Sequence, residues 1–158
     1  MYTLFHLRTI LEEKNMYKIT SEAHFDAAHF LFGYNGKCRN IHGHRWVVSA
    51  DIAAENLKDD PQERGMVTDF GSFKKFLKAE ADRLDHSLIY EKGSLRSDTL
   101  AALLAEEFAL NEVDFRPTAE NFSKYFFDKL KEAGFPVTRV KVYETPENCA
   151  IFEVDSNG

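Results

Sequence analysis

The chain of 158 residues has the composition of one globular domain, because 44% of its residues are hydrophobic and 13% are aromatic. Its 20 basic and 26 acidic side chains give a formal net charge of −6, which argues against a nucleic-acid-binding protein, since such proteins need a concentrated basic surface. No apolar stretch is long enough for a membrane helix, and the first residues lack a secretory pattern. We therefore expect a cytoplasmic protein with reduced thiols, in which a disulfide between Cys38 and Cys149 is disfavoured.

Alternating hydrophobic and polar residues predict two long strands in the first third of the chain. The first runs from about residue 17 to 29 and the second from about 41 to 53. A loop with Gly and Asn at residues 32–37 joins them, so we expect an antiparallel hairpin. Residues 1–15 have poor periodicity, and we interpret them as an N-terminal extension to a single domain over residues 16–158.

Hydrophobic residues at helical spacing predict three helices in the middle of the chain. Asp69 is expected to cap the first helix, and Ser97 or Asp98 the second. Two strands, at residues 137–144 and 149–154, close the chain. The order strand, strand, helices, strand, strand indicates an α+β fold with an antiparallel sheet. The predicted helices span about residues 70–84, 98–108 and 118–133.

The segment Cys38–His44 carries the residue types of a metal site. His42 and His44 are two residues apart on a predicted strand, so their imidazoles point to the same side of the sheet. His29 lies on the partner strand if the hairpin forms, and it can supply a third ligand. Three protein ligands with one open position is the arrangement of catalytic zinc, whereas structural sites close all four positions. The sequence therefore predicts a zinc ion (Zn2+) on these histidines.

Cys38 has two open interpretations. Its thiolate is able to bind zinc as a fourth ligand, or to lie beside the metal as a reactive group in an electropositive neighbourhood. The residues alone do not decide between these roles. A metal-binding cupin barrel is the other fold that fits the spacing from Gly36 to His44, but it then requires a Glu where the chain has Val48 and Ser49.

Three acidic residues and one further histidine are weaker candidates. Asp85 beside His86 is able to form a proton relay, but the residues alone favour simpler helix-end roles, in which His86 complements the helix C-terminus and Asp85 acts as a cap. Glu144 lies on an otherwise apolar strand face and is able to accept two N–H bonds from a ring with a guanidine-like edge, such as a pterin. Glu120 most simply complements the positive end of its helix.

Together these motifs resemble the 6-pyruvoyltetrahydropterin synthase / 6-carboxytetrahydropterin synthase family. The matching segments occur in the family's order and cover most of residues 16–154. They are residues 25–29, 38–44, 65–70, 84–86, 117–121 and 142–145.

The resemblance implies the tunnelling fold (T-fold). In that fold each subunit contributes a four-stranded antiparallel sheet with helices packed on one side, in the order β-β-α-α-β-β. It also implies a homo-oligomer, a hexamer or a tetramer, in which subunits join their sheets into a barrel and active sites lie between them. The chain departs from compact members of the family at residues 1–15 and at about 91–113, where we expect an extra inserted helix.

The resemblance also implies roles for the site residues. Zinc would bind His29, His42 and His44, Cys38 would abstract a proton, and Asp85 with His86 would form the relay. Glu144 would anchor the pterin, and Thr118 and Glu120 belong to the substrate-binding motif.

The spacing between Cys38 and the His-Gly-His motif resembles that of the bacterial, carboxy-forming enzymes of queuosine biosynthesis. The pyruvoyl-forming animal enzymes have a longer gap between the Cys and this motif. The expected activity is that of a zinc-dependent lyase, which converts 7,8-dihydroneopterin triphosphate to 6-carboxytetrahydropterin, acetaldehyde and triphosphate. The alternatives are a pyruvoyl product from the same substrate, and a non-enzymatic zinc-binding module in which Cys38 is the fourth ligand.

Overall fold

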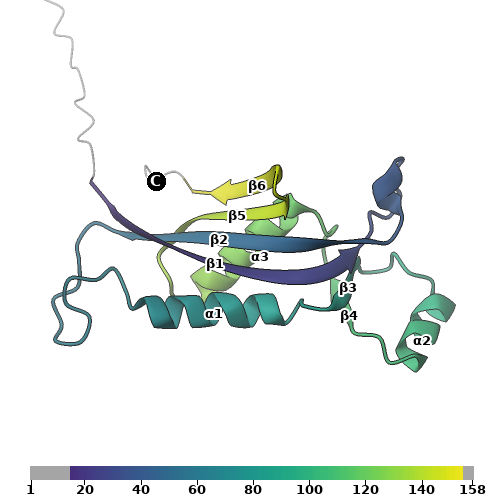
Figure 1. Ribbon diagram of the computed structural model, residues 1–158, viewed down its shortest axis with the longest axis horizontal. Coiled ribbons are helices and arrows are strands. Elements are labelled where there is room, and N and C mark those ends of the chain that lie inside the picture. The colour runs from purple at the N-terminus through teal and green to yellow at the C-terminus, as the bar shows by residue number, and fades with distance from the viewer. Residues whose placement is uncertain (1–14, 155–158) are drawn as a thin grey trace, which may run out of the picture.

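A curled, six-stranded mixed sheet organises residues 15–154, the part of the chain that the computed structural model describes (Figure 1). The strand order across the sheet is β4-β3-β1-β2-β5-β6. The predicted extension at residues 1–15 falls almost entirely outside the described residues. In chain order the elements are β1 (Tyr17–His29), the 3₁₀ turn η1 (Lys37–Arg39), β2 (His42–Ala54), α1 (Phe70–Asp82), β3 (Ser87–Glu91), α2 (Ser97–Ala105), β4 (Leu110–Val113), α3 (Ala119–Glu132), β5 (Val137–Thr145) and β6 (Asn148–Glu153).

The long hairpin of β1 and β2 confirms the two predicted strands. They pair antiparallel over their whole length, from Tyr17 opposite Ala54 to His29 opposite His42. Alternate residues are buried along β1 from Ser21 to His29, as the period of two requires, and Phe25 is fully buried, whereas residues 48–53 of β2 are all buried.

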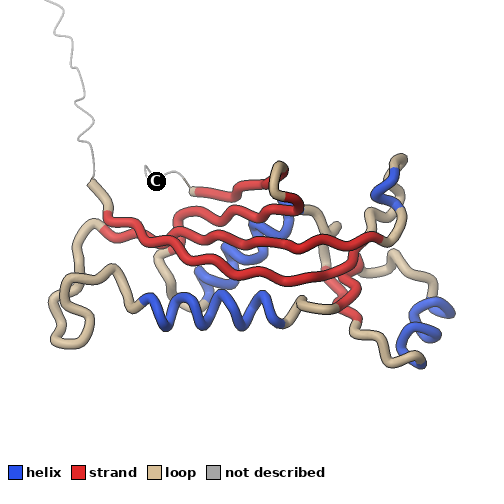
Figure 2. The backbone as a smooth tube through the Cα atoms, in the orientation of Figure 1, coloured by secondary structure: helices blue, strands red, loops and turns tan. Residues whose placement is uncertain are grey.

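The hydrophobic core lies between the sheet and two helices, α1 and α3, which cover the same face (Figure 2). Phe25 of β1 stacks on Trp46 of β2 with ring centroids 5.9 Å apart. Phe122 of α3 meets Trp46 edge to face at 5.0 Å. Leu77 of α1 is also fully buried. Aromatic contacts of this kind stabilise the helix-to-sheet packing beyond the area that they bury.

The ends of α1 and α3 agree with the sequence predictions. The side chain of Asp69 accepts a hydrogen bond from the Ser72 backbone N–H at 2.8 Å and so caps α1. Gly134 follows α3 with a φ of +87°, the left-handed conformation that commonly ends helices. The predicted cap of α2 is wrong, because Ser97 is already its first residue and Arg96 precedes it without a side-chain cap.

The expected four-stranded antiparallel sheet is wrong in strand number and in direction. β3 pairs parallel to the end of β1, from Ala27 opposite Ser87, and β4 pairs parallel to β3. These strands have five and four residues, which is too short for a clear alternating pattern, so the sequence indicated only a loop and an amphipathic helix there. The inserted segment at about 91–113 therefore holds both α2 and β4, while the α+β class stands.

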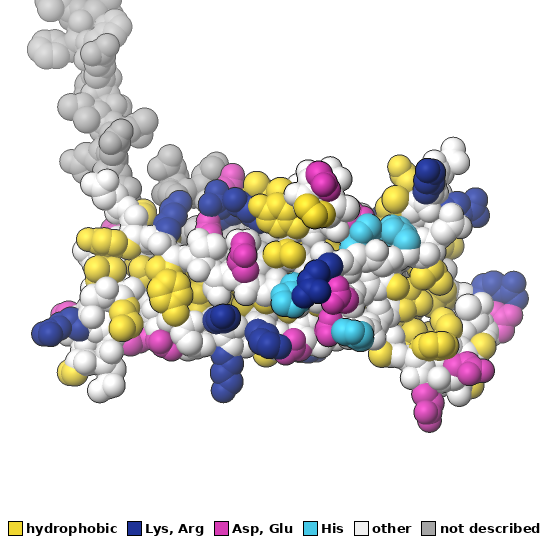
Figure 3. All heavy atoms as spheres, in the orientation of Figure 1, with side chains coloured by type: hydrophobic (Ala, Val, Ile, Leu, Met, Phe, Trp, Pro, Cys, Tyr) yellow, Lys and Arg dark blue, Asp and Glu magenta, His cyan; other side chains and the backbone are white. Residues whose placement is uncertain are grey.

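The inserted helix α2 lies apart from the core, beyond the end of the sheet that carries β3 and β4 (Figure 1). Hydrophobic side chains gather on this end of the molecule (Figure 3). A cavity of about 670 Å³ is lined by Leu103 of α2, by Phe108 and Leu110, and by His44 and His86. Among the described residues, no helix is long and apolar enough to cross a membrane.

The packing of α1 generates a stability prediction. Leu77→Ala should lower the free energy of unfolding by about 2–5 kcal/mol, because it leaves a cavity against the sheet. Lys75→Ala is the matched control on the exposed side of α1 and should change it by less than about 0.5 kcal/mol. Urea unfolding at one protein concentration, followed by circular dichroism, measures both values. Equal losses in the two variants would contradict this packing.

Candidate active site

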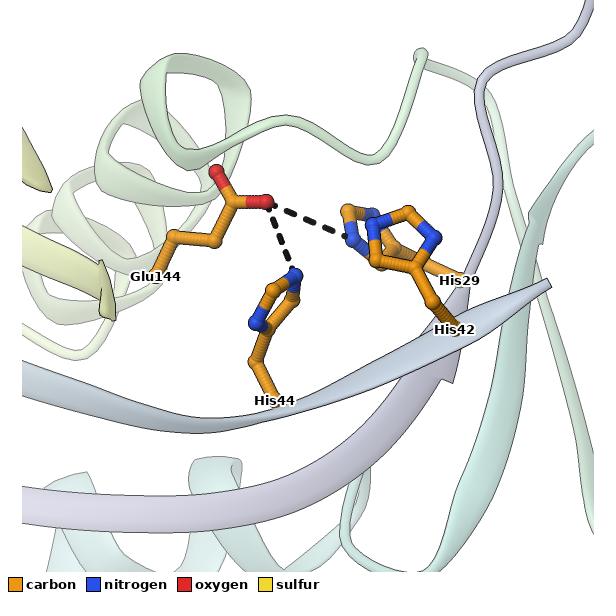
Figure 4. Close-up of side chains that lie close together, drawn as sticks. All are labelled: His29, His42, His44 and Glu144. Carbon is orange, nitrogen blue, oxygen red and sulfur yellow. Dashed lines mark ion pairs between the residues drawn. The ribbon is translucent and has the colours of Figure 1, made fainter. Parts of the chain in front are cut away.

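The three predicted metal ligands meet at the end of the β1–β2 hairpin (Figure 4). The register places His29 directly opposite His42, and His44 follows on the same face of β2. Their ring centroids are 4.5 Å apart for His29–His42, 5.2 Å for His29–His44 and 5.0 Å for His42–His44. The structure therefore brings together the histidines that the His-x-His spacing indicated.

Backbone carbonyl groups orient two of these rings. Nδ1 of His29 lies 2.7 Å from the carbonyl oxygen of Pro117, and Nδ1 of His42 lies 2.7 Å from that of Asn40. A carbonyl oxygen only accepts hydrogen bonds, so Nδ1 donates in both cases and carries the proton. The lone pair of each ring is then on Nε2, the tautomer that metal-ligating histidines use when the other nitrogen is held in this way.

The Nε2 atoms of His29, His42 and His44 are all buried and make no hydrogen bond. Leaving buried acceptors unpaired costs free energy, and a cation among them would offset that cost. Three imidazole nitrogens are a donor set that suits zinc. The residues present therefore fit the metal that the sequence predicted.

Glu144 of β5 completes a group of four possible ligands. Its Oε1 lies 3.0 Å from Nε2 of His44 and 3.6 Å from Nε2 of His29 (Figure 4). One ligand atom from each of these residues and from His42 all lie within 4.8 Å of one another. The sequence singled out Glu144 as a carboxylate on an apolar face, but not its closeness to the histidines, which depends on the pairing of β2 with β5.

Burial keeps two of the imidazoles neutral. It lowers the pKa of His29 from 6.5 to about 4, although the bond to Pro117 partly opposes this. It also lowers the pKa of His44, against the opposing effect of the Glu144 carboxylate. Both rings are therefore unprotonated at pH 7 and available as ligands.

Cys38 lies in η1, within the loop that connects His29 to His42, and is half-buried. Its carbonyl oxygen accepts the Leu31 backbone N–H at 2.8 Å, which closes this loop. Within residues 15–154, its sulfur is not part of the four-residue ligand group. Cys38 and Cys149 are both free thiols. The structure thus places Cys38 in the loop between the two strands that carry the histidines.

Asp85 and His86 form a close pair in the turn between α1 and β3. Nδ1 of His86 lies 2.7 Å from Oδ2 of Asp85. The backbone of Asp26 on β1 holds both residues, since its N–H donates to Oδ1 of Asp85 and its carbonyl oxygen accepts the His86 N–H, each at 2.7 Å. The contact is possible because α1 ends at Asp82, so the helical geometry that separates adjacent side chains no longer applies.

The electrostatics of this pair are those of a carboxylate that supports an imidazolium. Hydrogen bonding and charge from Asp85 raise the pKa of His86. The N–H of Asp26, followed by the contact with His86, lowers the pKa of Asp85. Neither residue belongs to the ligand group at the hairpin end.

The remaining predicted substrate residues lie at the start of α3. Thr118 caps this helix by accepting the Asn121 backbone N–H at 3.3 Å, and Glu120 is exposed in the first turn. Thr118 directly follows Pro117, whose carbonyl oxygen orients His29. The motif is thereby tied to the histidine cluster through the backbone.

The lowered pKa of His29 predicts how stability depends on pH in chelator-treated protein. Below pH 6.5 the unfolded chain binds a proton that the folded chain excludes until about pH 4, so the free energy of unfolding should fall across this window. The loss between pH 7 and pH 5 should be about 2 kcal/mol, and His44 adds to it in the same direction. Urea unfolding at the two pH values measures it. His29→Gln is the control and should show a weaker dependence; an unchanged slope would contradict the assignment.

Comparison with known proteins identifies the family of this chain. The model of the 6-pyruvoyl tetrahydropterin synthase family matches residues 18–155. A 6-carboxy-5,6,7,8-tetrahydropterin synthase of Rickettsia bellii is 39% identical over 145 residues, covering 86% of this chain and 99% of the relative. The enzyme of that name from Haemophilus influenzae is 35% identical over 144 residues, covering 87% and 99%.

Two solved structures show the same fold. The 6-pyruvoyl tetrahydropterin synthase of Caenorhabditis elegans has a TM-score of 0.62 at 24% identity, covering 89% of this chain and 97% of that one. An uncharacterized protein from Wolinella succinogenes has a TM-score of 0.70 at 22% identity, covering 89% and 99%. The expected tunnelling fold is thus confirmed. The chain belongs to the 6-pyruvoyl tetrahydropterin synthase family of enzymes.

Proposed function

We propose that the protein is a zinc-dependent 6-carboxy-5,6,7,8-tetrahydropterin synthase of queuosine (7-deazaguanine) biosynthesis. Its substrate would be 7,8-dihydroneopterin triphosphate, and its products 6-carboxytetrahydropterin, acetaldehyde and triphosphate. The observation that carries the proposal is the group of three buried Nε2 atoms of His29, His42 and His44, which lie close together and make no hydrogen bond. The names of the relatives at 35% and 39% identity support the carboxy product over the pyruvoyl product.

The histidines would hold zinc, which supplies a Lewis acid that polarises the side-chain oxygens of the substrate. The Pro117 and Asn40 carbonyl groups would keep the imidazoles oriented while substrate enters and products leave. Because catalytic sites keep an open position for substrate, we assign Glu144 to the pterin rather than to the metal. Its carboxylate would accept two N–H bonds from the guanidine-like edge of the ring.

Proton transfer would fall to the thiol and to the Asp–His pair. Cys38 would accept a proton from the substrate side chain, and His86, supported by Asp85, would move protons to and from its oxygens. Among the described residues, Asp85 and His86 are not members of the ligand group of their own chain. We therefore propose that the active site forms between subunits of a homo-oligomer, a hexamer or a tetramer, in which a second copy brings this pair to the histidines.

Identifying the products tests the proposed reaction. Incubation of the zinc-loaded protein with 7,8-dihydroneopterin triphosphate should release acetaldehyde and 6-carboxytetrahydropterin in equal amounts, as measured by mass spectrometry and an aldehyde-trapping assay. A pyruvoyl product without acetaldehyde would contradict the carboxy product and would indicate 6-pyruvoyltetrahydropterin synthase activity instead. No turnover by a zinc-loaded oligomer would favour the non-enzymatic module.

The two cysteines offer a matched pair of variants for the role of the thiol. Cys38→Ala should retain zinc within about twofold of the native affinity and lose turnover by about 10²-fold or more, because it removes a proton acceptor and not a ligand. Cys149→Ala, at an exposed position near the start of β6, should keep both properties. Zinc content by atomic emission and single-turnover rates measure the outcome. Loss of zinc from Cys38→Ala would instead make the thiol a ligand.

A further inference from the structure

The turn that presents Asp85 and His86 is held from outside by one side chain of the inserted segment. The Nδ2 group of Asn111, on β4, donates to the carbonyl oxygen of Arg83 at 3.1 Å and to Oγ of Ser87 at 2.7 Å. Ser87 Oγ in turn donates to the Leu84 carbonyl oxygen at 2.7 Å. Asn111 therefore joins the two ends of the turn.

The backbone of this turn needs such support. His86 has a φ of +52°, a left-handed conformation that is unfavourable for a residue with a Cβ. A residue stays in this conformation only where the surrounding structure holds it. Asp26 holds the turn on the β1 side, and Asn111 holds it on the other side.

The sheet topology explains why Asn111 comes from the insertion. β4 runs parallel to β3, with Asn111 opposite Ile89, and parallel neighbours need a crossover connection. The chain between β3 and β4, including α2, makes this connection. Without it the amide of Asn111 would not reach Arg83 and Ser87.

We propose that Asn111 is a positioning residue that holds Asp85 and His86 in their reactive arrangement, and that the inserted segment contributes to the reaction in this way. The inference rests on the proposed function, because it takes His86 as a proton carrier. It adds a role for a segment that contributes no residue to the ligand group.

The contact between His86 and Asp85 provides a readout that does not depend on turnover. The carboxylates that act on the His86 ring are those of Asp85 and Asp26, and Asp26 is itself 3.6 Å from Nη1 of Arg45. Because Asp85 raises the pKa of His86, loosening the turn should move this pKa back toward its ordinary value.

The test uses the full-length, zinc-loaded protein with histidine ¹³C-labelled at Cε1, and His86→Gln assigns the signal. In Asn111→Ala the NMR-detected pKa of His86 should fall, and kcat should drop by about 10²-fold with KM within about twofold, since small displacements of catalytic groups have effects of this size. Zinc content should not change. Ser87→Ala removes the same link from the other end and should shift both values in the same direction, which keeps the test valid if one variant folds poorly.

The matched control is Glu112→Gln, the next residue on β4, which is exposed and faces Tyr90 rather than the turn. It should leave the pKa of His86 unchanged. An unchanged pKa and kcat in both Asn111→Ala and Ser87→Ala would overturn the inference, as would a loss of zinc that accounts for the lower kcat. A lowered pKa of His86 with an unchanged kcat would support the hold of Asn111 on the turn and overturn the proposed role of His86 in proton transfer.

Discussion

The register of the β1–β2 hairpin is the constraint on which the rest of the structure depends. It places His29 opposite His42 and, through the same alternation, buries Phe25 and Trp46 beneath α3. A shift of one residue would turn every one of these side chains to the other face. The buried aromatic rings therefore fix the register, and the register fixes the geometry of the histidine cluster.

The same packing prepares the histidines for a metal at a cost in stability. Burial lowers the pKa of His29 and of His44 and so keeps these two imidazoles neutral, and the Pro117 carbonyl directs the lone pair of His29 toward its neighbours. Unpaired acceptors in a buried site are unfavourable in the isolated chain. Zinc would thus stabilise the folded state at the place where it also supports the reaction.

The Asp85–His86 pair is built on a different principle. It stands in an exposed turn whose shape comes from hydrogen bonds to the backbone of Asp26 and to the side chain of Asn111. In the proposed chemistry, the histidines on β1 and β2 would bind the metal, and the turn with Asp85 and His86 would transfer protons. The side chain of Asn111 comes from the segment over residues 91–113 and supports this turn.

The sequence by itself determined the elements whose patterns are local and repeated. The period of two put His42 and His44 on one face, and cap residues marked the starts of α1 and α3. Tertiary structure decided what depends on neighbours. β3 and β4 are too short for their sequences to specify a pairing. The prediction of a four-stranded sheet therefore missed these two strands, which pair in parallel with β1 and with each other. The closeness of Glu144 to the histidines depends on the pairing of β5 with β2, and the placement of Asp85 and His86 depends on their hydrogen bonds to the backbone of Asp26. These features arise between segments far apart in the chain, where no local periodicity reports them.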